Sequence, residues 1–168
     1  MLMCKNRMIS FTRTIVLVLV ITSFLFISKS YASDYYPKYL DNNPNFILTD
    51  GHMDGGIYYD KSSVVNVSYN PPYYKIAVNL VYVPQVTKGN TAISNVSTTY
   101  FTYDYDKRTV DVSFYVNKEN RWYAFNDLKP GAAMYKVRGN LDAAELAFFQ
   151  IYGLKFFNLK YLDYKTVL

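Results

Sequence analysis

Strict alternation of apolar and polar residues in the segment 110–116 constrains the fold more than any other feature. Apolar residues take every second position and polar or amphipathic residues fill the gaps, in the order Val110, Asp111, Val112, Ser113, Phe114, Tyr115, Val116. Successive side chains of a β-strand point to opposite faces. The segment therefore predicts a strand with one apolar face.

Two further strand candidates flank this segment and are separated from it by short polar stretches. Residues 98–105 are rich in Thr, Tyr and Phe, which suit a pleated, half-buried surface, and residues 121–125 have the same character. The stretches 104–108 and 117–120 have the length and composition of hairpin turns. The region 95–125 is expected to form three consecutive antiparallel strands.

The residues before this region contain further strand candidates separated by turns. The candidate strands are 46–48, 56–60, 64–69 and 73–83, and the intervening turns, dense in Gly, Asp, Ser or Pro, are 49–56, 61–63 and 70–72. In the longest strand one face is apolar and carries Ile76, Val78, Leu80 and Tyr82. The opposite face begins with Lys75 and is expected to be partly solvated.

One amphipathic helix is predicted over residues 140–157. Asn140 can cap its first turn, where acidic residues also favour the unpaired N–H groups. Apolar residues follow helical spacing at Ala144, Ala147, Phe148, Ile151 and Leu154. We expect Phe148 on this stripe and Trp122 at the start of the last meander strand to be buried between the sheet and the helix.

These elements predict an α+β fold, a mostly antiparallel sheet (a meander) with one C-terminal helix packed on a face. Residues 46–168 are expected to form a single α+β domain, preceded by an extended and poorly ordered lead-in, residues 33–45. The tail 158–168 gives no clear pattern, so its role is not predicted.

The first 32 residues have the organisation of a signal peptide. A basic leader precedes an apolar run of about 14 residues, and the small residues Ser30 and Ala32 follow it. Cleavage after Ala32 would leave Ser33 as the first residue. The alternative is an uncleaved membrane anchor, although the run is shorter than the roughly 20 residues that a spanning helix needs. We therefore expect export to the periplasm, the cell surface or the medium, with no stable membrane span after cleavage.

The charge and cysteine content change once this leader is set aside. Four of the 18 basic residues and none of the 13 acidic residues lie in it, so the remaining chain has almost no net charge. No concentrated basic stretch points to nucleic acid as a partner. Cys4, the only cysteine, leaves with the leader, so neither a disulfide nor thiol chemistry is expected.

The residues that could bind a metal ion or form a histidine-based catalytic centre are few. His52 is the only histidine, which leaves no partner set for a Ser/His/Asp triad or a zinc site. The spacing of Asp50 and Asp54 resembles part of an EF-hand loop, but the position of its final Glu holds Lys61. A weaker calcium site that uses Asp50, Asp54 and Asp60 is the alternative. No cofactor or metal site is predicted.

Paired carboxylates are the remaining route to hydrolytic chemistry. Asp104, Asp106 and Asp111 are close in the sequence, but the first two fall in a predicted hairpin turn, where Asp is favoured for backbone reasons. Glu119 also falls in a turn. No pattern places two of these acids in one pocket, so no catalytic residue is predicted.

Tyrosine is unusually frequent, with 19 residues in the chain. Tyrosine suits strands and tolerates a wet edge, so it can serve either a β-rich core or an aromatic binding surface for sugar or peptide. If a ligand is bound, exposed tyrosines of the solvated face are the candidate contacts. We select Tyr103, Tyr105 and Tyr115 as the first candidates.

Two short segments carry a resemblance to a known family. Residues 57–64 read Ile-Tyr-Tyr-Asp-Lys-Ser-Ser-Val, and residues 101–108 read Phe-Thr-Tyr-Asp-Tyr-Asp-Lys-Arg. With the long strand between them, they resemble small exported bacterial proteins of the surface-adhesin E type, over roughly residues 46–126. The chain lacks the cysteines that many such proteins carry. The resemblance implies an envelope or surface role and no catalytic residues.

The sequence thus favours a small exported non-enzymatic protein of a bacterial cell envelope that acts by binding an envelope protein or a glycan. One alternative is a secreted hydrolase of carbohydrate or peptide, which would need a cleft with two close carboxylates. Another is an inhibitor-like module that pairs an edge strand with a partner.

Overall fold

The structure is a computed structural model that describes residues 35–116, 119–133 and 139–168. Residues Asp34–Leu168 form one compact unit. The predicted signal peptide and its cleavage point lie outside the described residues. Within the described ranges no helix has the length and apolar character needed to cross a membrane.

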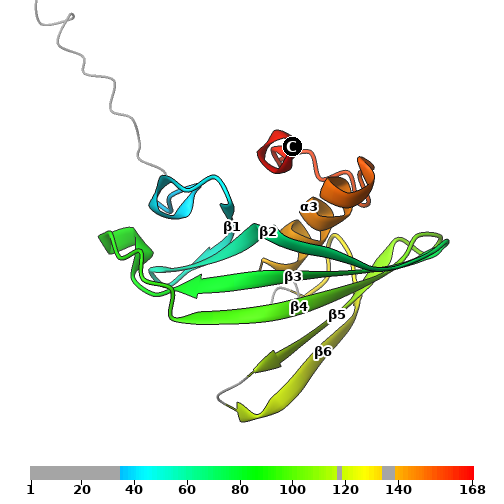
Figure 1. The fold of residues 1–168 in the computed structure, drawn as a ribbon, viewed down its shortest axis with the longest axis horizontal. Helices are drawn as coiled ribbons and strands as arrows, with labels where there is room; N and C mark the ends of the chain where they lie inside the picture. Colours follow the sequence, from blue (N-terminus) through cyan, green and yellow to red (C-terminus); the bar gives the residue numbers. More distant parts are fainter. Residues whose placement is uncertain (1–34, 117–118, 134–138) are drawn as a thin grey trace, which may run out of the picture. The chain divides into compact units, whose positions relative to one another are not determined.

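A single antiparallel sheet organises the described chain, and its strands follow one another in sequence order (Figure 1). Its six strands are β1 (Phe46–His52), β2 (Gly55–Asn70), β3 (Tyr73–Val83), β4 (Asn95–Asp104), β5 (Thr109–Val116) and β6 (Arg121–Leu128). The helix α3 (Asn140–Tyr152) follows the sheet. The predicted α+β fold, a meander with one C-terminal helix, is confirmed.

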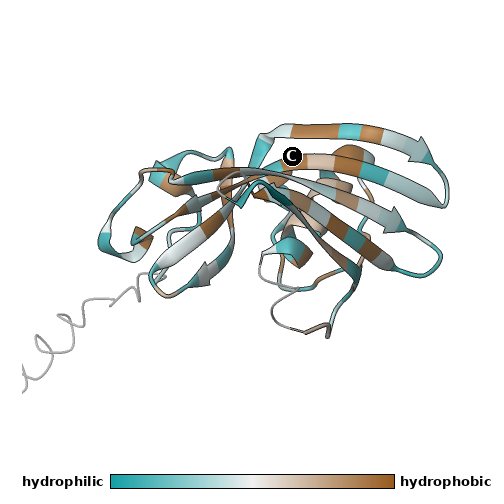
Figure 2. Cartoon of the chain, turned by 90° about the horizontal axis from the view of Figure 1, so that it is seen from below, coloured by the Kyte–Doolittle hydropathy of each residue, from teal (hydrophilic) through white to brown (hydrophobic). Residues whose placement is uncertain are grey.

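Apolar and polar residues alternate along the strands, which gives the sheet two different faces (Figure 2). We call the face toward α3 the inner face and the opposite one the outer face. On β3, whose predicted bounds are confirmed, Ile76, Val78 and Leu80 are buried in the inner core. Tyr82 continues this face but is 41% exposed, because it lies beyond the core cluster.

The N-terminal hairpin differs from its prediction. Strand β1 continues to His52, so the predicted turn over 49–56 is much shorter. The chain reverses at Met53 and Asp54, which both have positive φ, as the two-residue turns of β-hairpins require. Glycine at Gly55 and Gly56 then lets the chain pass close to the rings of Tyr82 and Tyr58.

The predicted turn at 61–63 is also wrong, because β2 is one long strand with an irregularity after Asp60. The carboxylate of Asp60 accepts hydrogen bonds from the backbone N–H and the hydroxyl of Ser62. The hydroxyl of Ser63 accepts a bond of 2.8 Å from the backbone N–H of Asn79 on β3. These side chains replace the ladder bonds that the irregularity interrupts.

Helix α3 is shorter than predicted. It ends at Tyr152, and its C-cap Gly153 has a left-handed conformation that glycine adopts without steric cost. Its N-cap is Gly139, so the prediction that Asn140 caps the helix is wrong. Leu154 lies beyond the helix end and is 54% exposed, whereas Phe148 is 1% exposed in the inner core, as predicted.

The inner core lies between α3 and the sheet and is strongly aromatic. The ring of Phe148 lies 4.9 Å from that of Tyr103 and 5.0 Å from that of Phe156, centroid to centroid. Tyr59 is fully buried and donates a hydrogen bond of 2.8 Å to the Gln150 side chain. These contacts dock the helix on β2 and β4.

The lead-in is packed against the sheet rather than poorly ordered over its described residues. Tyr39 forms a β-bridge with Ile47, and Leu40 is buried at the start of the short 3₁₀ helix η1 (Leu40–Asn42). A second, smaller core on the outer face unites the lead-in with β2, β3 and the 3₁₀ helix η2 (Val86–Lys88). Its buried members are Leu40, Tyr58, Val81, Val83 and Val86.

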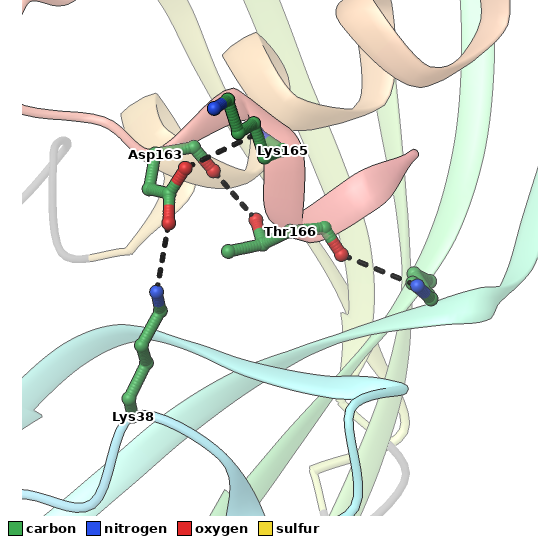
Figure 3. Close-up of polar contacts among 5 residues, drawn as sticks. Lys38, Asp163, Lys165 and Thr166 are labelled. Carbon is green, nitrogen blue, oxygen red and sulfur yellow. Dashed lines mark hydrogen bonds and ion pairs between the residues drawn. The ribbon is translucent and has the colours of Figure 1, made fainter.

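The C-terminal segment also packs on the domain, and it ends in the 3₁₀ helix η4 (Tyr164–Val167). Lys38 Nζ lies 2.8 Å from a carboxylate oxygen of Asp163 (Figure 3). Lys61 Nζ donates to the backbone carbonyl of Thr166 at 3.2 Å. The tail 158–168 is therefore attached both to the lead-in and to β2.

Candidate functional site

The outer face of the sheet is open where the smaller core ends. Over β4, β5 and β6 it carries a shallow hollow of about 540 Å³, lined by Val96, Thr98, Tyr100, Tyr115 and Trp122. We call this surface the outer aromatic patch. Trp122 is 58% exposed and Val96 is 46% exposed, so the patch presents apolar area to solvent.

The rings of the outer aromatic patch lie next to one another. The Trp122 ring centroid is 5.5 Å from that of Tyr115 and 6.0 Å from that of Tyr100. Lys75 Nζ lies 5.1 Å from the Tyr100 centroid, within the range of a cation–π contact. The patch therefore combines three aromatic rings with one cation.

The strand register explains why these rings meet. Tyr115 is directly opposite Trp122 in the β5–β6 pair, and residues directly opposite each other share a face. Tyr100 is opposite Ser113, and Ser113 is opposite Ala124, so small side chains occupy the neighbouring positions of this face. The register thus places Tyr100, Tyr115 and Trp122 on the same face of neighbouring strands.

Hydrogen-bonding groups border the rings. The hydroxyl of Thr98 donates a bond of 2.8 Å to the side-chain carbonyl of Asn79, and the hydroxyl of Tyr115 donates to the side chain of Asn120. Hydroxyl and amide groups beside exposed rings can form hydrogen bonds with a polar ligand while the rings cover its apolar parts.

Trp122 was expected between the sheet and the helix, and that prediction is wrong. Phe114 and Tyr123, which oppose each other, lie on the inner face, so their neighbours Tyr115 and Trp122 must point outward. The sequence contained a signal for this arrangement. If the turn 117–120 joins residues 116 and 121 as partners, position 122 falls opposite position 115.

The structure does not bring the three predicted tyrosines together. Tyr103 is fully buried, and its hydroxyl donates a bond of 2.8 Å to the carbonyl of Ala144 on α3. The prediction that Tyr103 is exposed is wrong, because Tyr103 is opposite Val110 and shares its buried face. Burial also raises the pKa of the Tyr103 hydroxyl well above 10.0.

The other two predicted tyrosines lie on opposite faces. Tyr105 is half-buried on the inner side, with its ring 6.0 Å from that of Phe148 and 5.8 Å from that of Phe156. Of the three predicted tyrosines, only Tyr115 belongs to the outer aromatic patch. Tyr100 and Trp122 were not identified from the sequence as neighbours of Tyr115, because the candidate residues were selected by tyrosine content and not by cross-strand pairing.

Of the acids that could have served hydrolysis, Asp104, Asp111 and Glu119 have structural partners. Asp104 forms an ion pair of 2.9 Å with Lys107, and the hydrogen bonds from the Lys107 side chain and backbone hold the pKa of Asp104 below its usual value. Asp111 accepts the backbone N–H of Asp127 at 3.0 Å. Glu119 accepts a hydrogen bond from the hydroxyl of Tyr123.

The calcium alternative finds no support in the described part of the chain. Asp54 is engaged with Lys88 at 2.8 Å and accepts hydrogen bonds from Tyr35 and Thr87. Asp60 is bonded to Ser62 within its own strand. Among the described residues, no three acidic, histidine or cysteine side chains are grouped so as to hold a metal ion.

The outer aromatic patch is thus a candidate binding surface formed by neighbouring strands. Comparisons of the chain with protein-family models, with curated proteins and with solved structures find no match.

Proposed function

We propose that this chain is a small exported protein of a bacterial envelope, without enzymatic activity, that binds a glycan through the outer aromatic patch. The observation that carries the proposal is the exposure of Trp122, 58%, on an open sheet face beside Tyr115 and Tyr100. Exposed aromatic area of this kind marks interaction sites on proteins.

A glycan suits the chemistry of the patch better than a wholly apolar partner. Sugar rings have C–H faces that pack on aromatic rings and hydroxyl groups that form hydrogen bonds at their edges. The patch supplies rings at its centre and the polar side chains of Thr98, Asn79 and Asn120 around them. The other candidate partner is an envelope protein that presents a similar mixture of groups.

The proposed lack of enzymatic activity is supported by the roles of the acidic residues. Catalytic carboxylates need pKa values suited to proton transfer near the working pH. Asp104 instead has a lowered pKa and is paired with Lys107. The resemblance of 57–64 and 101–108 to surface-adhesin E-type proteins also favours a role in binding at the cell surface.

The experiment is a glycan-array and titration assay of the full chain against a matched set of variants. We expect the combined substitution of Tyr100, Tyr115 and Trp122 by alanine to abolish binding. Tyr161→Ala is the matched control, because Tyr161 is 70% exposed outside the patch. Far-UV circular dichroism of each variant establishes that the fold is retained.

Two results would overturn this proposal. Unchanged glycan binding by a folded triple variant would remove the patch from function. Turnover of a polysaccharide or peptide that Asp104→Asn or Asp106→Asn abolishes would show that the chain is a hydrolase. Tyr103→Ala is unsuitable as a surface probe, because it removes a ring from the core.

A further inference from the structure

A second hollow lies where three segments far apart in the sequence meet, and it is lined by basic side chains. The β4–β5 turn contributes Lys107 and Arg108, the chain after β6 contributes Lys129, and the chain after α3 contributes Lys155. The hollow has a volume of about 440 Å³. We call it the basic cavity.

The basic cavity has an uneven charge balance. None of its lining residues is acidic, and the nearest ion pair joins Lys107 to Asp104 at 2.9 Å. The negative charge of Asp127 also raises the pKa of Lys107. Three of the four lining cations therefore lack a carboxylate ion pair among the described residues, which leaves the hollow positively charged.

Arg108 is held in place before any ligand arrives. A guanidinium N–H donates a bond of 2.7 Å to the carbonyl of Phe156, and the guanidinium carbon lies 3.9 Å from the Tyr105 ring centroid. An arginine fixed in this way loses little side-chain freedom on binding. Its remaining N–H donors match the geometry of a carboxylate, sulfate or phosphate group.

The rest of the lining suits an organic ligand rather than a bare ion. Pro130 and Phe157 provide apolar surface, and Asn158 provides an amide beside them. The volume falls within the usual range of ligand cavities, roughly 300–1,000 Å³. A sugar ring that bears an anionic group meets all three features, namely the cations, the apolar surface and the hydrogen-bonding amide.

We propose that the basic cavity binds an anionic sugar unit of an acidic saccharide, with Arg108 as the main contact of the anionic group. A nucleic acid needs a longer basic track than this cluster provides. The basic cavity shares no lining residue with the outer aromatic patch, so the two sites can be tested independently.

The test titrates the full chain with a heparin-derived tetrasaccharide and follows binding by NMR. Neutral cellotetraose, inorganic phosphate and vesicles of phosphatidylglycerol form the comparison arms. We expect the acidic tetrasaccharide to perturb Arg108, Lys129 and Lys155, and to bind more weakly as salt rises. Arg108→Gln should weaken binding about tenfold or more, since hydrogen bonds to charged groups are strong.

A second variant is needed because the Arg108 side chain also donates a hydrogen bond to the Phe156 carbonyl, so Arg108→Gln could disturb the fold as well as the site. The double substitution Lys129→Gln with Lys155→Gln leaves that bond intact and should also weaken binding about tenfold. Lys165→Gln is the matched control, because Lys165 is exposed on η4, and it should leave binding unchanged.

Several outcomes would overturn the proposal. Equal perturbation of Arg108, Lys129 and Lys155 by cellotetraose would show that charge plays no part. Phosphate that binds as tightly as the tetrasaccharide would indicate a site for a bare anion. Binding to vesicles alone would indicate a membrane contact, and variants that bind the tetrasaccharide like the unchanged chain would place its site elsewhere.

Discussion

The hydroxyl of Tyr164 donates a hydrogen bond of 2.5 Å to Oε1 of Glu145, a side chain with no exposed surface. The same carboxylate accepts the backbone N–H groups of Phe157 at 2.5 Å and Asn158 at 3.0 Å. Burial of a charge is costly unless hydrogen bonds compensate it. Glu145 therefore attaches the segment after α3 to the helix through three donors.

Replacement of Glu145 by glutamine tests this attachment. Glutamine keeps the shape but turns one acceptor oxygen into a donor, which then faces N–H and O–H donors of the C-terminal segment. We expect Glu145→Gln to lower the free energy of unfolding by about 1.5–3 kcal/mol, the range for hydrogen bonds to charged groups. Urea unfolding followed by circular dichroism gives the value.

The matched control is Glu119→Gln, because Glu119 is exposed and bonded to one hydroxyl, that of Tyr123. It should change the free energy of unfolding by less than about 1 kcal/mol. Equal losses for the two variants would contradict the role assigned to the buried carboxylate.

A pair of aromatic truncations tests the two faces of the sheet. Phe148→Ala removes a ring that is 1% exposed and should cost about 3–5 kcal/mol of stability. Trp122→Ala removes a ring that is 58% exposed and should cost less than about 1 kcal/mol. A larger loss for Trp122→Ala than for Phe148→Ala, measured by urea unfolding, would reverse the assignment of the faces.

Acid should weaken the hairpin that joins β1 and β2. Hydrogen bonds from Lys88, Tyr35 and Thr87 lower the pKa of Asp54 from 3.8 to about 2. A carboxyl group whose pKa is lower in the folded state contributes stability above its unfolded pKa and loses it as the pH falls. The contribution of Asp54 should therefore decline between about pH 4 and pH 2.

Unfolding by urea at a series of pH values across this window measures the effect. We expect Asp54→Asn to flatten the decline, and Asp106→Asn, a change to an exposed turn residue, to leave it as in the unchanged chain. An unchanged decline in Asp54→Asn would mean that other acids account for it.

Maturation provides a prediction for the N-terminal residues. The small residues Ser30 and Ala32 after the apolar run predict that the exported protein begins at Ser33. Sequencing the N-terminus of the protein recovered from the periplasm or medium would confirm it. An intact leader in the membrane fraction would favour the anchor instead.

The regular parts of the fold were predictable because their signals are local. Alternation in 73–83 and 110–116 and helical spacing around Phe148 depend on neighbouring residues only. The long β2 strand was not predictable in the same way. Its polar residues Ser62 and Ser63 have turn composition, and the bond from Asn79 that holds Ser63 in the strand comes from another element.

In the candidate sites too, local features were predictable from the sequence, whereas contacts between elements were not. Tyr115 could be selected from composition, but its partner Trp122 requires the register of a hairpin. The buried state of Tyr103 follows from its pairing with Val110, which also depends on register. Arg108, Lys129 and Lys155 meet only in the folded chain, so no segment of the sequence contains a basic cluster that would reveal the cavity.

The ion pair between Lys38 and Asp163 joins residues 125 positions apart in the sequence. It holds the beginning and the end of the folded unit side by side (Figure 3). Chain ends that lie close together can be linked, and new ends opened elsewhere, without loss of the fold. The domain is therefore suited to circular permutation, with new termini in the open loop at Gly89. The outer aromatic patch or the basic cavity could then be presented from a different point of attachment.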